Sequence, residues 1–326
     1  MAEVANRQQS FPESTTDTKT KPIALVTGGA GFIGSNLVNE LAQRGYRVYA
    51  VDDCSLGTFD NFDTGENIQP VRQCVTEPLP DWLFEETDVV FHLAAKSSTK
   101  MHEQEPRWGA KVNVEGFVNV MENCLSHGIE DVVYASSSTV YGNPDTVPTH
   151  EDVPLDPTTR YAASKASRER YAVAYRAQGL NVVGARFFST YQGYEHQEGH
   201  KGEHGNVISM FAEDMANGDR PVVYGNGTQT RDFIHVSDTV RALIEMIGLN
   251  GVYNVCRGEA VTFNEVVEAL NDALGTELEP EYIEPPLDGE YVAVQEGDRS
   301  KLTEDTGWEP QVDVPVGMQR VVAPYL

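Results

Sequence analysis

Three side chains of this 326-residue chain have the types and spacing that hydride transfer needs: Ser137, Tyr161 and Lys165. In Tyr161-Ala-Ala-Ser-Lys165 the phenol and the ammonium are one helical turn apart, so a helix would place both on one face. A nearby cation favours the phenolate over the phenol. Tyr161 could then act as a base well below the ordinary tyrosine pKa of about 10.

Ser137 belongs to the run Ala135-Ser-Ser-Ser-Thr-Val-Tyr-Gly142, which closes a predicted strand 24 residues before Tyr161. A Tyr-x3-Lys pair arises easily by chance, so the position of this run matters. In parallel α/β sheets, ligands bind at the carboxyl ends of the strands. A serine run can also be a simple turn or helix cap, and these residues alone leave that alternative open.

A glycine-rich turn joins an apolar run at 23–27 to a helical pattern that starts at residue 33. The first glycine permits a tight turn, the next lets backbone N–H groups approach phosphates, and the last lets the helix close onto the strand. The free N–H donors of the helix start favour negative charge. We therefore expect a dinucleotide pyrophosphate beside Gly28, Gly31, Phe32, Ile33 and Gly34.

A second predicted strand, 46–51, ends in Asp52 and Asp53. A carboxylate at this point of the fold accepts hydrogen bonds from the adenosine ribose hydroxyls and repels a 2′-phosphate. The expected cofactor is therefore NAD rather than NADP. Its positive nicotinamide ring would favour the Tyr161 phenolate further.

Strands alternate with helices through the first half of the chain, which indicates a parallel, doubly wound sheet. The predicted strands are 23–27, 46–51, 88–93, 131–136 and 180–187, and the predicted helices lie near 33–44, 107–127, 160–178, 207–217 and 264–274. We expect an α/β Rossmann domain with a smaller C-terminal α/β substrate domain. The expected division is a disordered tail at 1–20, an NAD-binding domain at 21–187 plus about 230–256, and a substrate-binding domain at 188–229 and 257–326.

The charge balance is strongly acidic, with 50 Asp and Glu against 24 Lys and Arg, for a formal −26. Such a surface repels nucleic acid and anionic membranes, so neither is an expected partner. Acidic residues are spread along the whole chain, which favours a solvated surface suited to high salt, and hence a halophilic source, over a site for cationic partners.

Other sequence features indicate a soluble cytoplasmic protein. No apolar run is as long as a membrane span, and the N-terminus lacks the pattern of a signal peptide. The four cysteines form no CxxC pair, which fits a reducing compartment.

Taken together, these motifs resemble those of the extended short-chain dehydrogenase/reductases, specifically the NAD-dependent epimerase/dehydratase family of sugar-nucleotide enzymes. The resemblance covers roughly residues 23 to 310. The motifs are TGGAGFIG at 27–34, HLAA at 92–95, NVEG at 113–116, SSSTVYG at 136–142, YAASK at 161–165, RFF at 186–188 and YGNGTQTRDFIHV at 224–236.

The resemblance implies a reaction class. It makes Ser137, Tyr161 and Lys165 the catalytic set, with Lys165 also holding the nicotinamide ribose. Family dehydratases carry Asp-Glu at the two positions after the catalytic serine, and decarboxylating relatives carry Glu at the second. Ser138 and Thr139 stand there instead, as in 4-epimerases of the UDP-glucose type. Transient oxidation to a keto-sugar followed by hydride return is the leading hypothesis.

The resemblance also implies contacts to cofactor and substrate. Around NAD it adds Leu93, Ala94, Ala95, Asn113 and Phe188 to the residues named above. Around the nucleotide sugar it places Ser98, Ser137, Ser138, Tyr161, Asn206 and Arg231, with Arg231 on the diphosphate.

Three departures from the family pattern keep alternatives open. Ser189 replaces a common Asn, Cys74 replaces an adenine-contacting Asp, and the usual Arg-Pro-Gly-Asp segment appears as Pro286-Leu-Asp-Gly289. Because the first and last of these weaken the phosphate grip, an NAD-dependent dehydrogenase of free aldoses is the alternative, and a nucleotide-sugar dehydratase is less favoured. An NAD-sensing module would not need Ser137, Tyr161 and Lys165.

Two further features bear on metals and assembly. His196, His200 and His204 recur every fourth residue, but Gly199, Gly202 and Gly205 argue against a helix there, so we expect a substrate-covering loop and no bound metal. The helix near 107–127 takes part in dimer formation in relatives, which makes a homodimer plausible.

Overall fold

The computed structural model describes residues 21–63, 65–192, 198–284 and 293–326. Its centre is a seven-stranded sheet in the order β10-β6-β5-β4-β1-β2-β3, in which every neighbouring pair is parallel. The order of the strands reverses between β1 and β4, which is the topological switch point of a doubly wound fold. The strands are β1 (Ile23–Thr27), β2 (Arg47–Asp52), β3 (Ile68–Arg72), β4 (Val89–His92), β5 (Asp131–Ser137), β6 (Asn181–Phe187) and β10 (Gly251–Val255).

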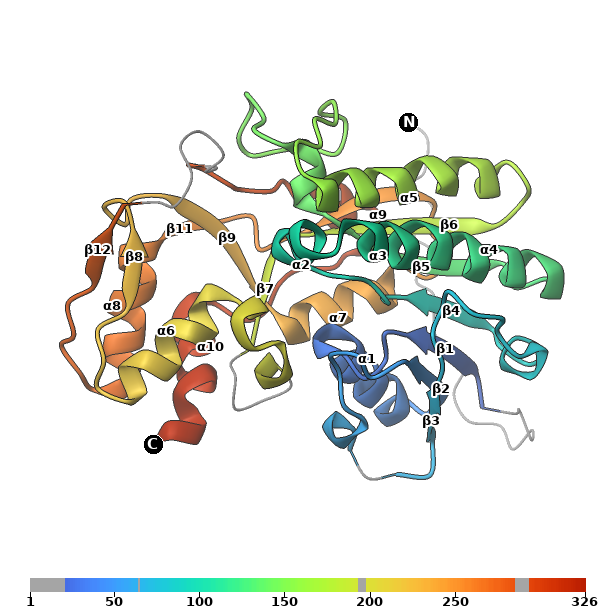
Figure 1. The fold of residues 1–326 in the computed structure, drawn as a ribbon, viewed down its shortest axis with the longest axis horizontal. Helices are drawn as coiled ribbons and strands as arrows, with labels where there is room; N and C mark the ends of the chain where they lie inside the picture. Colours follow the sequence, from blue (N-terminus) through green and yellow to red (C-terminus); the bar gives the residue numbers. More distant parts are fainter. Residues whose placement is uncertain (1–20, 64, 193–197, 285–292) are drawn as a thin grey trace, which may run out of the picture.

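Helices cover both faces of this sheet, as Figure 1 shows. On one face, α1 (Phe32–Gln43) and α7 (Val236–Glu245) contribute Leu37, Leu41 and Leu243 to a buried apolar layer. On the other face, α4 (Gly116–His127) and α5 (Arg160–Arg176) contribute Phe117 and Tyr175. The predicted α/β fold class is confirmed.

The five predicted strands form within one residue of their predicted bounds. Strand β3 was not predicted, because its sequence Ile-Gln-Pro-Val-Arg lacks alternation and contains Pro70. The proline is tolerated since β3 lies at the edge of the sheet, where a missing N–H breaks no ladder.

The predicted helix at 107–127 is helical but not regular. It consists of α3 (Pro106–Ala110), a π-helical turn η3 (Lys111–Glu115) and α4. Such π insertions are rare and frequently lie at functional sites. This one carries Asn113, which is fully buried.

A smaller lobe is built on two further sheets (Figure 1). Strands β11, β9 and β7 form one, and β12 and β8 the other, around an apolar core that includes Phe211, Phe233 and Leu270. The bounds are β7 (Ser189–Tyr191), β8 (Val222–Tyr224), β9 (Thr230–His235), β11 (Ala260–Thr262), β12 (Glu281–Ile283), α6 (Val207–Ala216), α8 (Phe263–Leu274) and α10 (Val314–Val322). The shorter helices are α2 (Thr99–Gln104), α9 (Ser300–Thr306), η1 (Phe59–Asn61), η2 (Asp81–Leu83), η4 (Ser138–Tyr141), η6 (Gly199–His204) and η7 (Ala323–Tyr325).

One expectation about this lobe was wrong. Residues 199–204 form the 3-10 helix η6, although three glycines spaced along 199–205 argued against any helix. The two turns of this 3-10 helix are short compared with a regular α-helix, so the cost of glycine in a helix did not prevent them from forming.

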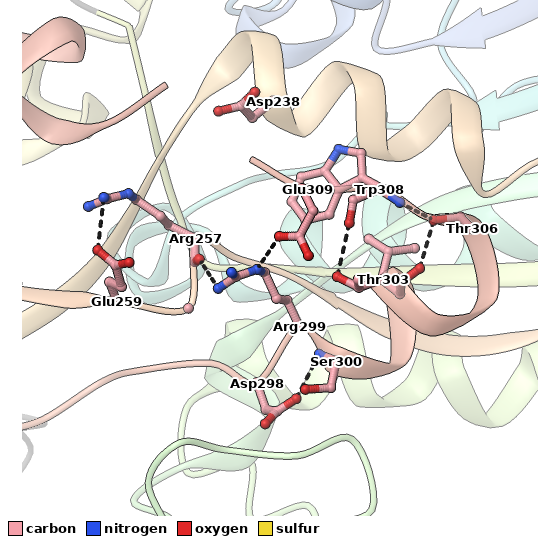
Figure 2. Close-up of polar contacts among 12 residues, drawn as sticks. Asp238, Arg257, Glu259, Asp298, Arg299, Ser300, Thr303, Thr306, Trp308 and Glu309 are labelled. Atoms are coloured by element: carbon pink, nitrogen blue, oxygen red, sulfur yellow. Dashed lines mark hydrogen bonds and ion pairs between the residues drawn. The ribbon is translucent and has the colours of Figure 1, made fainter. Parts of the chain in front are cut away.

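The chain returns from the smaller lobe to the large sheet through residues 293–309. Figure 2 shows how this return is anchored: Arg299 donates to the Arg257 carbonyl over 2.7 Å and pairs with Glu309 at 3.0 Å, while Asp298 accepts from the Ser300 amide at 2.7 Å. Trp308 is buried in the layer beneath α7. The anchored return carries Gln295 to the main cavity of the protein.

Candidate active site

A cavity of about 470 Å³ opens at the carboxyl ends of the central strands and extends toward the smaller lobe. Its size suits a bound cofactor and a small ligand. Most of the predicted site residues line it: Gly28, Gly31, Phe32, Ile33, Gly34, Asp52, Asp53, Leu93, Ala94, Ala95, Ser98, Ser137, Ser138, Tyr161, Lys165, Phe188 and Asn206.

The glycine turn forms a cradle that side chains would fill. Gly28 has a φ of +71°, and a Cβ there would lie 2.6 Å from the Ala94 amide nitrogen. A Cβ on Gly34 would collide with the Gly28 carbonyl, so this glycine is what lets α1 close onto the turn. Gly31 caps α1, and the first-turn amides of a helix have no partner within it, which suits a pyrophosphate.

The two predicted ribose carboxylates lie at the end of β2. Asp52 accepts from the amides of Ala30 (3.1 Å) and Cys54 (2.8 Å), and Asp53 accepts from the Ser55 amide at 2.8 Å. Burial raises the pKa of Asp52, while the two backbone hydrogen bonds oppose that shift. Both carboxylates line the cavity, and these backbone hydrogen bonds hold them there.

Tyr161 and Ser137 meet at the inner end of the cavity. Tyr161 lies in the first turn of α5, which Thr159 caps by accepting from the Ala162 amide at 3.1 Å. Ser137 ends β5, and its Oγ accepts from both the amide (3.3 Å) and the hydroxyl (3.0 Å) of Thr139. Ser137 also hydrogen-bonds with the phenol of Tyr161.

Lys165 lies one turn further along α5 and is 2 % exposed. Its Nζ donates to the Ala135 carbonyl at 3.0 Å and lies 5.7 Å from the centroid of the Tyr161 ring. Burial lowers the pKa of Lys165 well below its ordinary value, and the charge of Arg168 lowers it further.

The expected depression of the Tyr161 pKa is not produced by the protein groups. Burial raises the pKa of Tyr161 above its ordinary value, and the hydrogen bond with Ser137 and the charge of Arg168 offset only part of this. The reason is desolvation: a fully enclosed phenolate loses more from leaving water than these neighbours return.

Two predicted site residues do not line the cavity. Asn113 lies behind it, where its side chain accepts from the Lys96 amide (2.8 Å) and donates to Ser164 (2.9 Å). Arg231 is on β9, where it donates to the Thr230 carbonyl at 2.7 Å and its guanidinium lies 5.8 Å from the Phe263 ring. Their contacts with cofactor and substrate stay predictions.

The cavity also has lining residues that sequence reasoning missed, among them Lys96, Lys201 and Gln295, and it is lined by His204 of the predicted substrate-covering loop. Lys96 directly follows the HLAA motif, so its position in the sequence could have marked it as a site residue. Its Nζ donates to the Ser55 hydroxyl at 3.3 Å, on the side of the cavity where we expect adenosine. His204 contacts Ser98 at 3.2 Å. Gln295 donates to Ser138 at 3.0 Å, and no local pattern marks a residue that reaches the site from so late in the chain.

In the part of the chain that the structure describes, no three His, Cys, Asp or Glu side chains are placed to hold a metal ion. Of the three spaced histidines, His196 lies outside the described residues. Within the same part of the chain, no helix is long and apolar enough to cross a membrane.

The fold and site together define a short-chain dehydrogenase/reductase: a doubly wound sheet, a glycine cradle at its switch point, and a Ser-Tyr-Lys set at the strand ends. Comparison with known proteins narrows this class. The chain belongs to the NAD dependent epimerase/dehydratase family, whose sequence profile matches residues 24–256.

Several relatives are similar over nearly their full length. UDP-glucose 4-epimerase of Mycolicibacterium smegmatis is 35% identical over 91% of this chain and 96% of its own. The solved UDP-N-acetylglucosamine 4-epimerase of Methanobrevibacter ruminantium superposes with a TM-score of 0.87 at 29% identity, covering 94% of this chain and 98% of that one. UDP-glucose 4-epimerase of Thermus thermophilus, solved in complex with NAD, gives a TM-score of 0.81 at 31% identity over 93% and 98%. UDP-glucuronic acid decarboxylases also match, at 28% to 29% identity.

Proposed function

We propose that this protein interconverts nucleotide sugars as a 4-epimerase of the UDP-glucose type. One observation carries the choice among family reactions. The catalytic serine is followed by two neutral hydroxyl residues, Ser138 and Thr139, and these are engaged by Gln295 and Ser137 respectively. Elimination and decarboxylation need a general acid or base at this point, and a hydroxyl with an ordinary pKa cannot supply one.

The protein residues would divide the proton work between them. NAD, when bound, supplies the nicotinamide that takes up a hydride and returns it. The Tyr161 oxygen would take the proton of the sugar hydroxyl, and Ser137 would donate to the phenolate and hold the sugar oxygen in place. Lys165, close to the ring of Tyr161, would favour the phenolate and hold the nicotinamide ribose. Residues 28–34 would bind the pyrophosphate, and Asp52 and Asp53 the adenosine ribose.

The substrate contacts form a second part of the proposal. Ser98 and Asn206 line the cavity on its smaller-lobe side, and the Asn206 side chain is fixed because it caps α6 by accepting from the Ile208 amide at 3.0 Å. Arg231, which donates through Nη1 to the Thr230 carbonyl, would bind the substrate diphosphate. Pro286-Leu-Asp-Gly289, the altered phosphate segment, lies outside the described residues.

The remaining assignments concern the whole protein. Residues 21–187 with about 230–256 would form the NAD domain, and 188–229 with 257–326 the substrate domain, although β9 pairs with β7 and β11 rather than with the large sheet. A homodimer would form through the helical stretch at 107–127. The formal charge of −26 supports a halophilic source, and four cysteines without a CxxC pair support a cytoplasmic location.

The alternative is net oxidation of a free aldose on the same scaffold. An epimerase holds its NAD and accumulates no NADH, whereas a dehydrogenase releases NADH in proportion to product. Incubating the purified protein in high salt with UDP-glucose, UDP-galactose or free aldoses, and following both sugars and NADH absorbance, separates the two.

The residue assignment is tested by Tyr161→Phe. This variant should lose turnover by several orders of magnitude while it still binds NAD, because only the phenolic oxygen is removed. Tyr171→Phe is the matched control, since Tyr171 is on the same helix and 45% exposed. Retained activity in Tyr161→Phe would overturn the assignment.

A further inference from the structure

Arg168 lies inside the protein, directly behind the hydride-transfer residues. It is on α5, one turn after Lys165, and at 0 % exposure it is the largest fully buried side chain among the described residues. Its guanidinium donates to three backbone carbonyls: Nε to Asn113 at 2.6 Å, Nη2 to Ala94 at 2.8 Å and Nη1 to Ala135 at 3.3 Å.

These three carbonyls belong to three separate segments of the chain around the site. Ala94 follows β4, Asn113 is in the π-helical turn, and Ala135 is in β5. Ala94 and Ala135 themselves line the cavity. A guanidinium is rigid and planar, with its donors in fixed directions, so this one side chain fixes the spacing of all three segments.

Arg168 has no carboxylate partner among the described residues: none of the ion pairs found there includes it. The neighbouring Glu169 instead binds Arg186 at 2.7 Å and Ser136 at 2.6 Å. Burying a cation without a counter-ion is costly, and hydrogen bonds to carbonyls recover only part of that cost. Buried charge of this kind is characteristic of functional sites.

Arg168 also shares a hydrogen-bond acceptor with the lysine. The Ala135 carbonyl accepts from Lys165 Nζ at 3.0 Å and from Arg168 Nη1 at 3.3 Å. Two cations this close disfavour each other's charged form. Burial lowers the pKa of Arg168 to about 10, so it keeps its charge at neutral pH, whereas the pKa of Lys165 falls well below its ordinary value.

We propose that Arg168 is a positioning residue of the hydride-transfer site, which ties the ends of β4 and β5 and the π-helical turn together and keeps a fixed positive charge beside Lys165 and Tyr161. The proposal deepens the function proposed above and rests on it. In this arrangement the charge of Arg168 adds to the support that Lys165 gives the phenolate, and the lysine also faces the cofactor.

The other groups around Arg168 do not replace this charge. His92 on β4 and His102 on α2 face it, and burial lowers the pKa of both, so both are neutral at neutral pH. Tyr134 on β5 is buried with a raised pKa and stays a phenol. On α4, Phe117 presents its ring 5.9 Å from the guanidinium. Lys165 and Tyr161 are the remaining titratable neighbours.

The test measures the pKa of Tyr161 directly in the full-length, NAD-loaded protein. Tyrosine labelled with carbon-13 at Cζ is followed by NMR against pH, with Tyr161→Phe identifying the resonance. Arg168→Gln should raise the Tyr161 pKa by about one unit or more, a roughly tenfold loss of phenolate at a given pH. It should also weaken NAD binding, measured by calorimetry, about tenfold.

Arg168→Lys keeps a charge but loses the planar guanidinium. It should leave the Tyr161 pKa within about 0.3 unit of the parent and still weaken NAD binding about tenfold, because the donors of a compact ammonium diverge from one atom and cannot span the three carbonyls that the planar guanidinium reaches. Arg176→Gln is the matched control: Arg176 is on the same helix and donates to one carbonyl, that of Val182, away from the site. It should change neither quantity.

An unchanged Tyr161 pKa in folded Arg168→Gln would overturn the proposal, as would NAD binding in Arg168→Lys equal to the parent. If Arg168→Gln does not fold, the lysine variant decides alone. Both measurements need no sugar substrate, so an absence of epimerase activity would refute the proposed function while leaving these results interpretable.

Discussion

The Thr139 hydroxyl donates to Ser137 Oγ over 3.0 Å, from the residue position where an elimination enzyme of this family would carry a carboxylate. The Thr139 amide reinforces the contact at 3.3 Å. Together they hold Ser137 Oγ, which also hydrogen-bonds with the phenol of Tyr161. A position that carries an acid or base in a related reaction would thus serve here to orient the proposed catalytic serine.

Thr139→Val should therefore lower kcat by about tenfold with little change in KM, because the isosteric side chain removes the donor without changing the packing. Thr139→Ser keeps the hydroxyl and should retain most of the activity. Steady-state kinetics with UDP-galactose measures both. Equal kcat in the valine variant and the parent would show that Ser137 is oriented by other groups.

The pH dependence of turnover should depend on Ser137. Burial raises the pKa of Tyr161, and the hydrogen bond with Ser137 lowers it in part, so activity should rise with pH as the phenolate forms. Ser137→Ala removes that bond, so the rising limb should move to higher pH and kcat at neutral pH should fall about a hundredfold. A pH profile of kcat that keeps its midpoint in the alanine variant would contradict this role.

Asp232 makes the stability of the fold depend on pH. Its carboxylate accepts from the amides of Arg257, Gly258 and Gly297 at 2.7 to 3.2 Å, and burial raises its pKa to about 6. A folded-state pKa above the unfolded value means that its contribution to stability is present at low pH and is lost as the pH rises through about 6. The loss amounts to about 3 kcal/mol.

Asp232→Asn removes this titration. The variant should be less stable overall, by roughly 1–3 kcal/mol, because its amide NH₂ faces backbone donors. Its free energy of unfolding should nevertheless change less than that of the parent between pH 4 and 6. Urea unfolding at several pH values checks this, and an identical pH slope in both proteins would disprove it.

Salt should stabilise the protein. With 50 acidic residues against 24 basic ones, self-repulsion destabilises the compact state, and ions screen that repulsion. The melting temperature should rise by roughly ten degrees or more between about 0.1 M and 2 M KCl. A protein equally stable at both concentrations would speak against a halophilic source.

The sequence was sufficient to predict which residues of the glycine turn and of the Tyr-x3-Lys pair come together at one cavity. Gly28 and Gly34 are required by a left-handed φ and a close backbone approach, and Tyr161 and Lys165 by helical spacing, so their types and positions carry the information. The strands buried on both faces were predicted for the same reason, since their apolar runs are continuous.

The features that escaped prediction depend on tertiary packing. Nothing in the pattern around Arg168 shows that its guanidinium turns inward to three carbonyls, because an arginine in a helix ordinarily faces solvent. Gln295 reaches Ser138 only because the chain returns between the lobes. The π-helical turn at Asn113 and the raised pKa of Tyr161 likewise depend on neighbours distant in sequence.

The most direct test of the account is the fate of the hydride. UDP-glucose carrying deuterium at C4 is incubated with the NAD-loaded protein, and the UDP-galactose formed is analysed by mass spectrometry and NMR while NADH absorbance is followed. Return of the hydride within one site predicts UDP-galactose that retains deuterium at C4, with no net NADH. Loss of the label to solvent, or accumulation of NADH in proportion to an oxidised sugar, would contradict the proposed epimerisation.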